Sequence, residues 1–153
     1  MGKVDISQFQ GYLVGQVIAA AVGAITLIAA DFAGYYWRGY ALEERSWVCL
    51  IGCGLGSTLA ILVGLAGVAF ALYFAIQSLQ TKEDMSPMRL KENTRNTMLG
   101  GAFTAAYALL GAIVWIVTNL DTDWYLDTGF YGAFFGGLIT AGFAKMMFDK
   151  IEV

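Results

Sequence analysis

Four long segments without charged residues alternate with shorter polar ones along the chain. The uncharged segments cover residues 6–30, 46–81, 96–120 and 128–144, and all four are rich in Ala, Leu and Gly. A helix needs about 20 apolar residues to cross the hydrocarbon core of a bilayer. The first three segments exceed that length, and the fourth reaches it when the stem of Lys145 extends its apolar surface. The pattern lacks a period of two, which argues against strands.

The expected fold is an all-α membrane protein, a single domain over residues 1–153. It is a four-transmembrane-helix bundle with short outer loops and a longer cytoplasmic middle loop. Ser86 followed by Pro87 is typical of an N-cap with proline at the first helical position, so the third helix should project about three turns beyond the membrane. We expect the helices at about 6–36, 47–80, 87–120 and 128–148.

The basic residues predict the orientation. Four crossings place both termini and the middle loop on one side, and positive charge concentrates on the cytoplasmic side of membrane proteins. The opposite side would carry only Arg38 and Arg45. The side with the termini would carry Lys3, Lys82, Arg89, Lys91, Arg95, Lys145 and Lys150. We therefore expect a protein of the cell membrane, surrounded by the lipid bilayer, with cytoplasmic N- and C-termini.

Composition narrows the function classes. Hydrophobic residues make up 58% of the chain and charged residues 14%, whereas soluble domains carry about 25% charged residues. The net charge of −3 and the lack of a basic face argue against nucleic acid as a partner. The chain has no His, the commonest general base and metal ligand, and we expect no cofactor and no enzymatic activity. Cys49 and Cys53 are interpreted as small packing residues.

Small residues recur at every fourth position in three of the predicted helices. Such spacing lets helix backbones approach closely, which matters in lipid because the hydrophobic effect between helices is weak there. Two interpretations remain open: packing within one chain, or contact with a second copy or another membrane subunit. The glycines assigned to helix packing are Gly11, Gly15, Gly23, Gly52, Gly56, Gly64, Gly129, Gly132, Gly136 and Gly137.

Acidic residues on the outer side are the candidate cation ligands. Asp31 follows an apolar run and either pairs with Arg38 or Arg45 or forms part of an ion or proton site. The other carboxylates form either a solvated acidic loop or a vestibule that concentrates divalent cations such as calcium. The complete candidate set is Asp31, Asp121, Asp123, Asp127, Glu43 and Glu44.

The middle loop, residues 82–95, carries four basic residues. These residues either contact anionic lipid headgroups or simply hold the orientation of the helices.

One family resemblance is partial. Trp47, Cys49 and Cys53 are similar to the outer Trp-Cys-Cys region of claudin-like proteins, which also have four helices and cytoplasmic termini. The outer loop over 38–46 is too short for the extracellular sheet of that family, the Gly-Leu-Trp element is absent, and the cysteines are too close together. The chain is therefore not assigned to that family.

Three functions follow from these features. The first is a non-enzymatic bundle that acts by assembly, as a structural or accessory subunit. The second is a cation channel or transporter with an acidic outer vestibule, and the third, the weakest, is a lipid enzyme in the membrane. Low intramembrane polarity favours the first.

Overall fold

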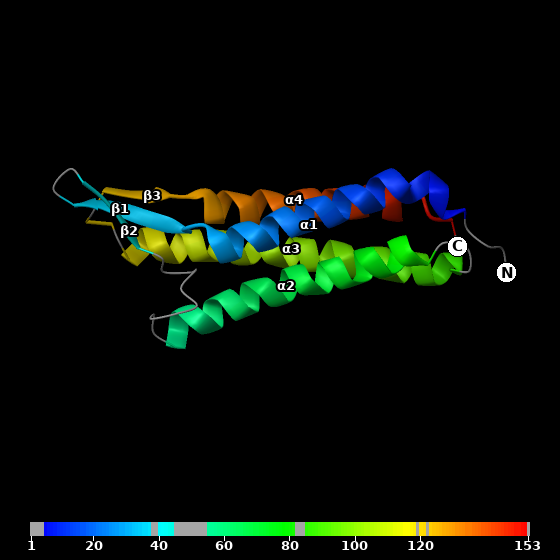
Figure 1. The fold of residues 1–153 in the computed structure, drawn as a ribbon, viewed down its shortest axis with the longest axis horizontal. Coiled ribbons are helices and arrows are strands. Elements are labelled where there is room, and N and C mark those ends of the chain that lie inside the picture. Colours follow the sequence, from blue (N-terminus) through cyan, green and yellow to red (C-terminus); the bar gives the residue numbers. More distant parts are fainter. Residues whose placement is uncertain are drawn as a thin grey trace.

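The computed structural model describes residues 5–37, 40–44, 55–81, 85–118, 120–121 and 123–152. Four helices run side by side along the long axis, and strands lie at one end (Figure 1). Both termini lie at the opposite end. We call these two ends the sheet end and the termini end. The helices are α1 (Gln10–Ala29), α2 (Leu55–Gln80), α3 (Pro87–Thr118) and α4 (Thr128–Phe148), and a short 3-10 helix, Ile6–Phe9, precedes α1.

Three helical segments are long and apolar enough to cross a membrane: Ile6–Ala29, Leu62–Gln80 and Pro87–Thr118. They indicate an integral membrane protein. The helix α4, with 21 residues that include five Gly and Lys145, is not in this group. α3 has 32 residues and is about 48 Å long, well beyond the roughly 30 Å of a hydrocarbon core.

A three-stranded antiparallel sheet corrects the expectation of an all-α chain. Its strands are β1 (Ala33–Trp37), β2 (Tyr40–Glu44) and β3 (Asp123–Leu126), in the order β2-β1-β3. Pairing places Gly34 opposite both Glu43 and Tyr125. The loop over 38–46, judged too short for the extracellular sheet of the claudin-like family, nevertheless contributes β2. The ladder is completed by β1, which precedes the loop, and by β3 from the connection between α3 and α4.

The first helix was predicted to reach residue 36, and this boundary is wrong. α1 ends at Ala29, and Ala30 adopts an extended backbone with φ −121° and ψ 152°. The following Gly34-Tyr-Tyr-Trp37 segment is aromatic, a composition that favours strands. The uncharged run ends at Ala30, but apolar and aromatic residues resume directly after Asp31, so hydrophobicity alone did not separate the helix from the strand.

α3 begins at Pro87 behind an N-cap residue. The Ser86 hydroxyl accepts a hydrogen bond from the Arg89 N–H at 3.3 Å, and the Ser86 carbonyl accepts one from the Leu90 N–H at 3.0 Å. Proline at the first position loses nothing because its missing N–H would have no helical partner there.

Two apolar clusters close the bundle, one toward each end. The cluster toward the sheet end comprises Ala20, Leu27, Phe32, Ala33, Val68, Ala108, Ala112, Trp115, Phe130 and Ala133. The second, which we call the end plug, comprises Ile6, Phe9, Leu13, Met85, Leu90, Met147 and Ile151 at the termini end. Between them the helices approach closely through small residues.

Candidate functional site

Asp31, the first candidate ligand, is half-buried in the segment that joins α1 to β1. Its backbone carbonyl accepts a hydrogen bond from the Gly129 N–H at 2.9 Å. A Cβ on Gly129 would lie 2.7 Å from that same oxygen. The segment therefore joins the end of α1 to the first turn of α4, a contact that requires glycine on α4.

Asp127 has a capping role in the fold. Its carboxylate accepts hydrogen bonds from the backbone N–H and the hydroxyl of Thr128, and its extended backbone precedes the first turn of α4. Its own N–H donates to the Phe32 carbonyl at 2.9 Å, which ties the cap to the chain beside β1. A carboxylate at an N-cap satisfies free helix N–H groups and interacts favourably with the helix dipole.

The remaining candidate ligands are dispersed. Asp121 and Asp123 are exposed, the first in a turn and the second at the start of β3. Glu43 and Glu44 belong to β2, which is separated from β3 by β1. Across β1, Glu43 and Glu44 align with Tyr125 and Leu126, and Asp123 aligns with Ala41, so no two of these acidic residues occupy matched positions in the sheet. Within the described ranges, no three acidic, Cys or His residues are grouped so as to hold a metal ion.

Substitutions at Asp127 distinguish a helix-capping role of its carboxylate from a role as a cation ligand. We expect Asp127→Ala to lower the free energy of unfolding by about 1 kcal/mol and Asp127→Asn to change it little, because Asn also caps helices well. Unfolding by sodium dodecyl sulfate in mixed micelles measures both, with the exposed Asp123→Ala as the matched control. Equal losses for Asp127→Asn and Asp127→Ala, appearing only with calcium present, would instead support a ligand role.

The predicted packing glycines of α4 face two neighbouring helices of the same chain. A Cβ on Gly136 would lie 2.8 Å from the Ala19 carbonyl oxygen of α1. A Cβ on Gly137 would lie 2.6 Å from the Gly101 carbonyl oxygen of α3. The two small-residue lines of α4 thus serve two intrachain contacts, the first of the two interpretations left open by the sequence.

Most other predicted packing glycines also contact neighbouring helices. A Cβ on Gly132 would overlap Thr26, and Cβ atoms on Gly15, Gly23 and Gly64 would touch Phe143, Gly132 and Tyr107, respectively. Gly11 differs, because it is exposed and nothing lies within 4 Å of the place of its Cβ. Gly52 lies outside the described residues, and Gly56 belongs to α2 but its surroundings are not described. Arg38, Arg45, Cys49 and Cys53 also lie outside the described residues.

The middle of the bundle is closed. The gap at its centre has no room for a water molecule and is lined by Ala20, Gly23, Val68, Ala71, Gly101, Thr104, Gly137 and Thr140. The buried threonines are satisfied within their own helices: the Thr104 hydroxyl donates to the Gly100 carbonyl at 2.9 Å, and the Thr140 hydroxyl to the Gly136 carbonyl at 2.7 Å. These polar groups therefore stabilise helices and do not line a path.

Gln16 is a buried polar side chain that forms its hydrogen bond outside its own helix. It is fully buried, and its Nε2 donates a weak hydrogen bond to the Met147 Sδ at 3.6 Å. Its Oε1 has no hydrogen-bond partner among the described residues. Gln16 therefore links α1 to α4 as an interhelical polar contact, the role expected for a single amide in a bundle.

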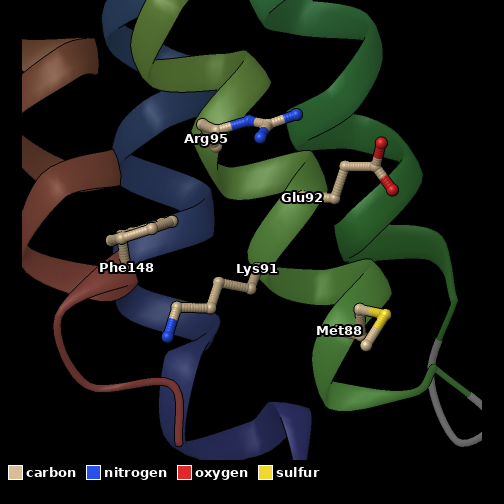
Figure 2. Close-up of a pocket in the computed structure, with 5 residues that line it drawn as sticks. All are labelled: Met88, Lys91, Glu92, Arg95 and Phe148. Carbon is tan, nitrogen blue, oxygen red and sulfur yellow. The ribbon is translucent and has the colours of Figure 1, made fainter. Parts of the chain in front are cut away.

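A pocket of about 380 Å³ at the termini end was missed from the sequence. Met88, Lys91, Glu92 and Arg95 of α3 line it together with Phe148 of α4 (Figure 2). The basic residues of the middle segment were noted, but Phe148 lies far from them along the chain. The spacing of Met88, Lys91 and Arg95 on one helix face was the available signal.

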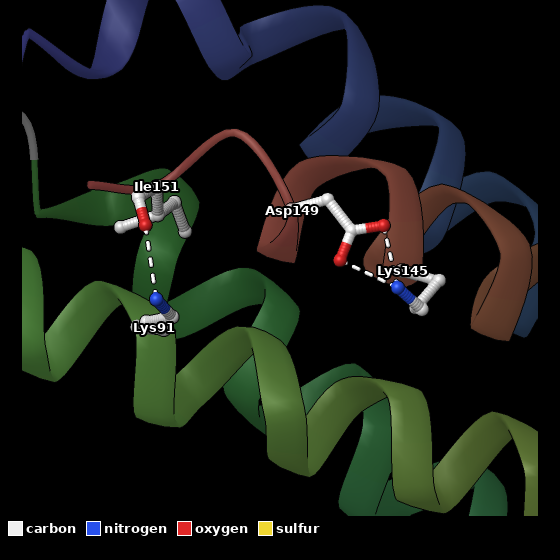
Figure 3. Close-up of polar contacts among 4 residues, drawn as sticks. All are labelled: Lys91, Lys145, Asp149 and Ile151. Carbon is white, nitrogen blue, oxygen red and sulfur yellow. Dashed lines mark hydrogen bonds and ion pairs between the residues drawn. The ribbon is translucent and has the colours of Figure 1, made fainter. Parts of the chain in front are cut away.

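Lys91 is positioned by the end of the chain. Its ammonium donates a hydrogen bond to the Ile151 carbonyl at 3.1 Å (Figure 3). The same ammonium lies 5.1 Å from the centre of the Phe148 ring. On the exposed side of α4, Lys145 pairs with Asp149. Thus one lysine is held at the pocket, while the other is neutralised by a carboxylate of its own helix.

No protein-family model, curated protein or solved structure matches the chain.

Proposed function

We propose that the protein is a four-span membrane protein that acts by assembly, as a structural or accessory subunit, and not by catalysis. The observation that carries this proposal is the closed interior, where the central gap between the four helices excludes water. In the described part of the chain this closed centre leaves no room for a solute, so other molecules would meet the outer surfaces of the bundle.

The fourth span is part of the proposal. α4 packs along α1 and α3, and its outward face bears exposed apolar residues like those of the other three helices. On α4 these residues are Tyr131, Phe135, Leu138, Ile139 and Met146. Exposed apolar side chains that continue around all four helices match the surface required by lipid and would be unfavourable in water.

We propose the cytoplasmic side for the termini end. Of the described residues, those at the termini end include Arg89, Lys91, Arg95, Lys145 and Lys150, whereas those at the sheet end include no Lys or Arg. This distribution agrees with the usual excess of positive charge on the cytoplasmic side.

The sheet supplies a surface suited to assembly. In the order β2-β1-β3, each outer strand has one edge without a partner strand in the described part of the chain. An open strand edge presents unpaired N–H and C=O groups on which a strand of another chain can pair. Because the small-residue faces of α4 are occupied by helices of the same chain, these edges are our preferred contact surface.

Measurement of cation flux into vesicles distinguishes the proposed assembly subunit from a cation channel or transporter. We expect purified, folded protein in proteoliposomes to pass calcium, sodium and potassium no faster than empty vesicles do. We also expect Asp31→Asn and the double variant Asp121→Asn with Asp123→Asn to give the same flux as the parent. In a separate measurement, photobleaching of labelled protein in membranes should count more than one copy per complex, or a stable partner should co-purify with the protein. Flux that exceeds empty vesicles and falls in those variants would contradict assembly and favour a channel.

A further inference from the structure

The pocket lined by Met88, Lys91, Glu92, Arg95 and Phe148 lies where charged and apolar surfaces of α3 meet. Arg95 is exposed, and one turn later Leu99 is 54% exposed, followed by Phe103 at 46%. Residues four apart lie on one face of a helix, so this face changes from charged to apolar within about 6 Å. Such a change is expected at the boundary between headgroups and hydrocarbon.

An apolar groove continues the same face into the membrane-spanning region. It has a volume of about 310 Å³, lies between α2 and α3, and is lined by Ala66, Gly67, Phe70, Leu99, Gly100 and Phe103. Gly67 and Gly100 bring the two helices together at its floor, where a Cβ on Gly100 would lie 2.9 Å from the Gly67 carbonyl oxygen. Leu99 follows Arg95 by one helical turn, so the groove begins directly beyond the pocket.

The charges around the pocket suit an anion. Lys91 and Arg95 are cationic and Glu92 is anionic, which leaves one net positive charge. Lys91 uses one N–H on the Ile151 carbonyl and retains two further donors. Within the described residues, Glu92 forms no ion pair with Arg95, although both extend on the α2 side of α3 in Figure 2. The guanidinium therefore remains available for a phosphate, which it can bind through two N–H groups.

We infer that an anionic phospholipid binds here, with its phosphate on the Arg95 guanidinium and one acyl chain in the groove between α2 and α3, while Lys91 adds positive charge on the α4 side of the pocket. The inference rests on the proposed placement of the termini end at a membrane surface. It gives the basic residues a defined ligand in addition to their effect on orientation. Basic pockets between helices at a membrane surface are suited to anionic headgroups.

Lipid titration of the full chain in detergent, read by native mass spectrometry, tests the headgroup. We expect phosphatidylglycerol to bind more tightly than phosphatidylcholine with the same chains. Arg95→Gln should weaken phosphatidylglycerol binding about fivefold, the value of one basic residue at a membrane surface. Arg89→Gln is the matched control, because Arg89 is exposed on the same helix outside the pocket, and should change nothing. Glu92→Gln should strengthen binding by removing the opposing charge.

A second pair of variants tests whether an acyl chain of the lipid occupies the groove between α2 and α3. Ala66→Phe would fill the groove and should weaken phosphatidylglycerol binding, whereas Ala69→Phe, at an exposed position of α2 outside the groove, should leave it unchanged. Unchanged thermal unfolding in all variants shows that the fold is retained.

Three results would overturn the inference. These are equal affinity for the two lipids, equal effects of Arg95→Gln and Arg89→Gln, or displacement of the lipid by soluble glycerol phosphate, which would indicate a phosphate site without a chain. None of them depends on whether the protein assembles or conducts cations, so failure of the proposed function would be seen separately.

Discussion

Replacing Gly137 with Leu should remove the stable bundle, lowering the free energy of unfolding by about 3 kcal/mol or more. A Cβ at this position would lie 2.6 Å from the Gly101 carbonyl oxygen and 2.7 Å from the Ala105 backbone nitrogen. Neither atom can move aside without displacing α3, since both belong to its backbone. Overpacking in a core typically costs about 1–3 kcal/mol, and here a rigid backbone meets a complete leucine side chain.

Gly142→Leu is the matched control for Gly137→Leu. It places the same side chain on the same helix, at an exposed glycine with nothing within 4 Å of its Cβ position. Unfolding in mixed micelles titrated with sodium dodecyl sulfate should show a large loss for Gly137→Leu and little change for Gly142→Leu. Equal stability of the two variants would mean that α4 does not meet α3 along this line.

The same pair distinguishes the two interpretations of the small residues. If the α4 glycines served contact between copies, Gly137→Leu would reduce the copy number while each chain stayed folded. If they pack the chain against itself, as the distances to Ala19 and Gly101 indicate, folding fails before assembly can be measured. Copy number and unfolding should therefore be measured on the same preparation.

Replacing Leu90 with Ala should lower the free energy of unfolding by about 3 kcal/mol. Leu90 is fully buried in the end plug, together with Leu13, Met85 and Met147. Truncation of a buried leucine typically costs about 2–5 kcal/mol through lost burial and the cavity that remains. The end plug lies at the termini end, beyond the change from charged to apolar surface between Arg95 and Leu99 of α3. We therefore expect water rather than lipid around it, and the hydrophobic effect at full strength.

Met88→Ala is the control for Leu90→Ala. Met88 belongs to the same first turn of α3 but is 61% exposed. We expect its truncation to change the free energy of unfolding by less than about 0.5 kcal/mol. Chemical unfolding monitored by far-UV circular dichroism measures both variants. A loss for Leu90→Ala no larger than that for Met88→Ala would mean that the end plug contributes little to the bundle.

The sequence by itself determined the helical, membrane-spanning character of the chain, because long apolar runs have few alternatives. It also located the start of α3, since Ser86 and Pro87 act locally through a cap and a fixed backbone angle. The glycine spacing identified positions where two helix backbones come close together, because only a residue without a side chain permits that contact.

Only the tertiary structure decided the rest. The sheet forms from residues 33–37, 40–44 and 123–126, and the β1–β3 pairing joins segments distant in the chain, which no local pattern specifies. Asp127 resembled a cation ligand in sequence, yet its carboxylate caps α4, because its role depends on which N–H groups lie within reach. The pocket at the termini end likewise required Phe148 to meet Lys91 across two helices. Local patterns specify which helices form, whereas partners across the bundle depend on how those helices pack.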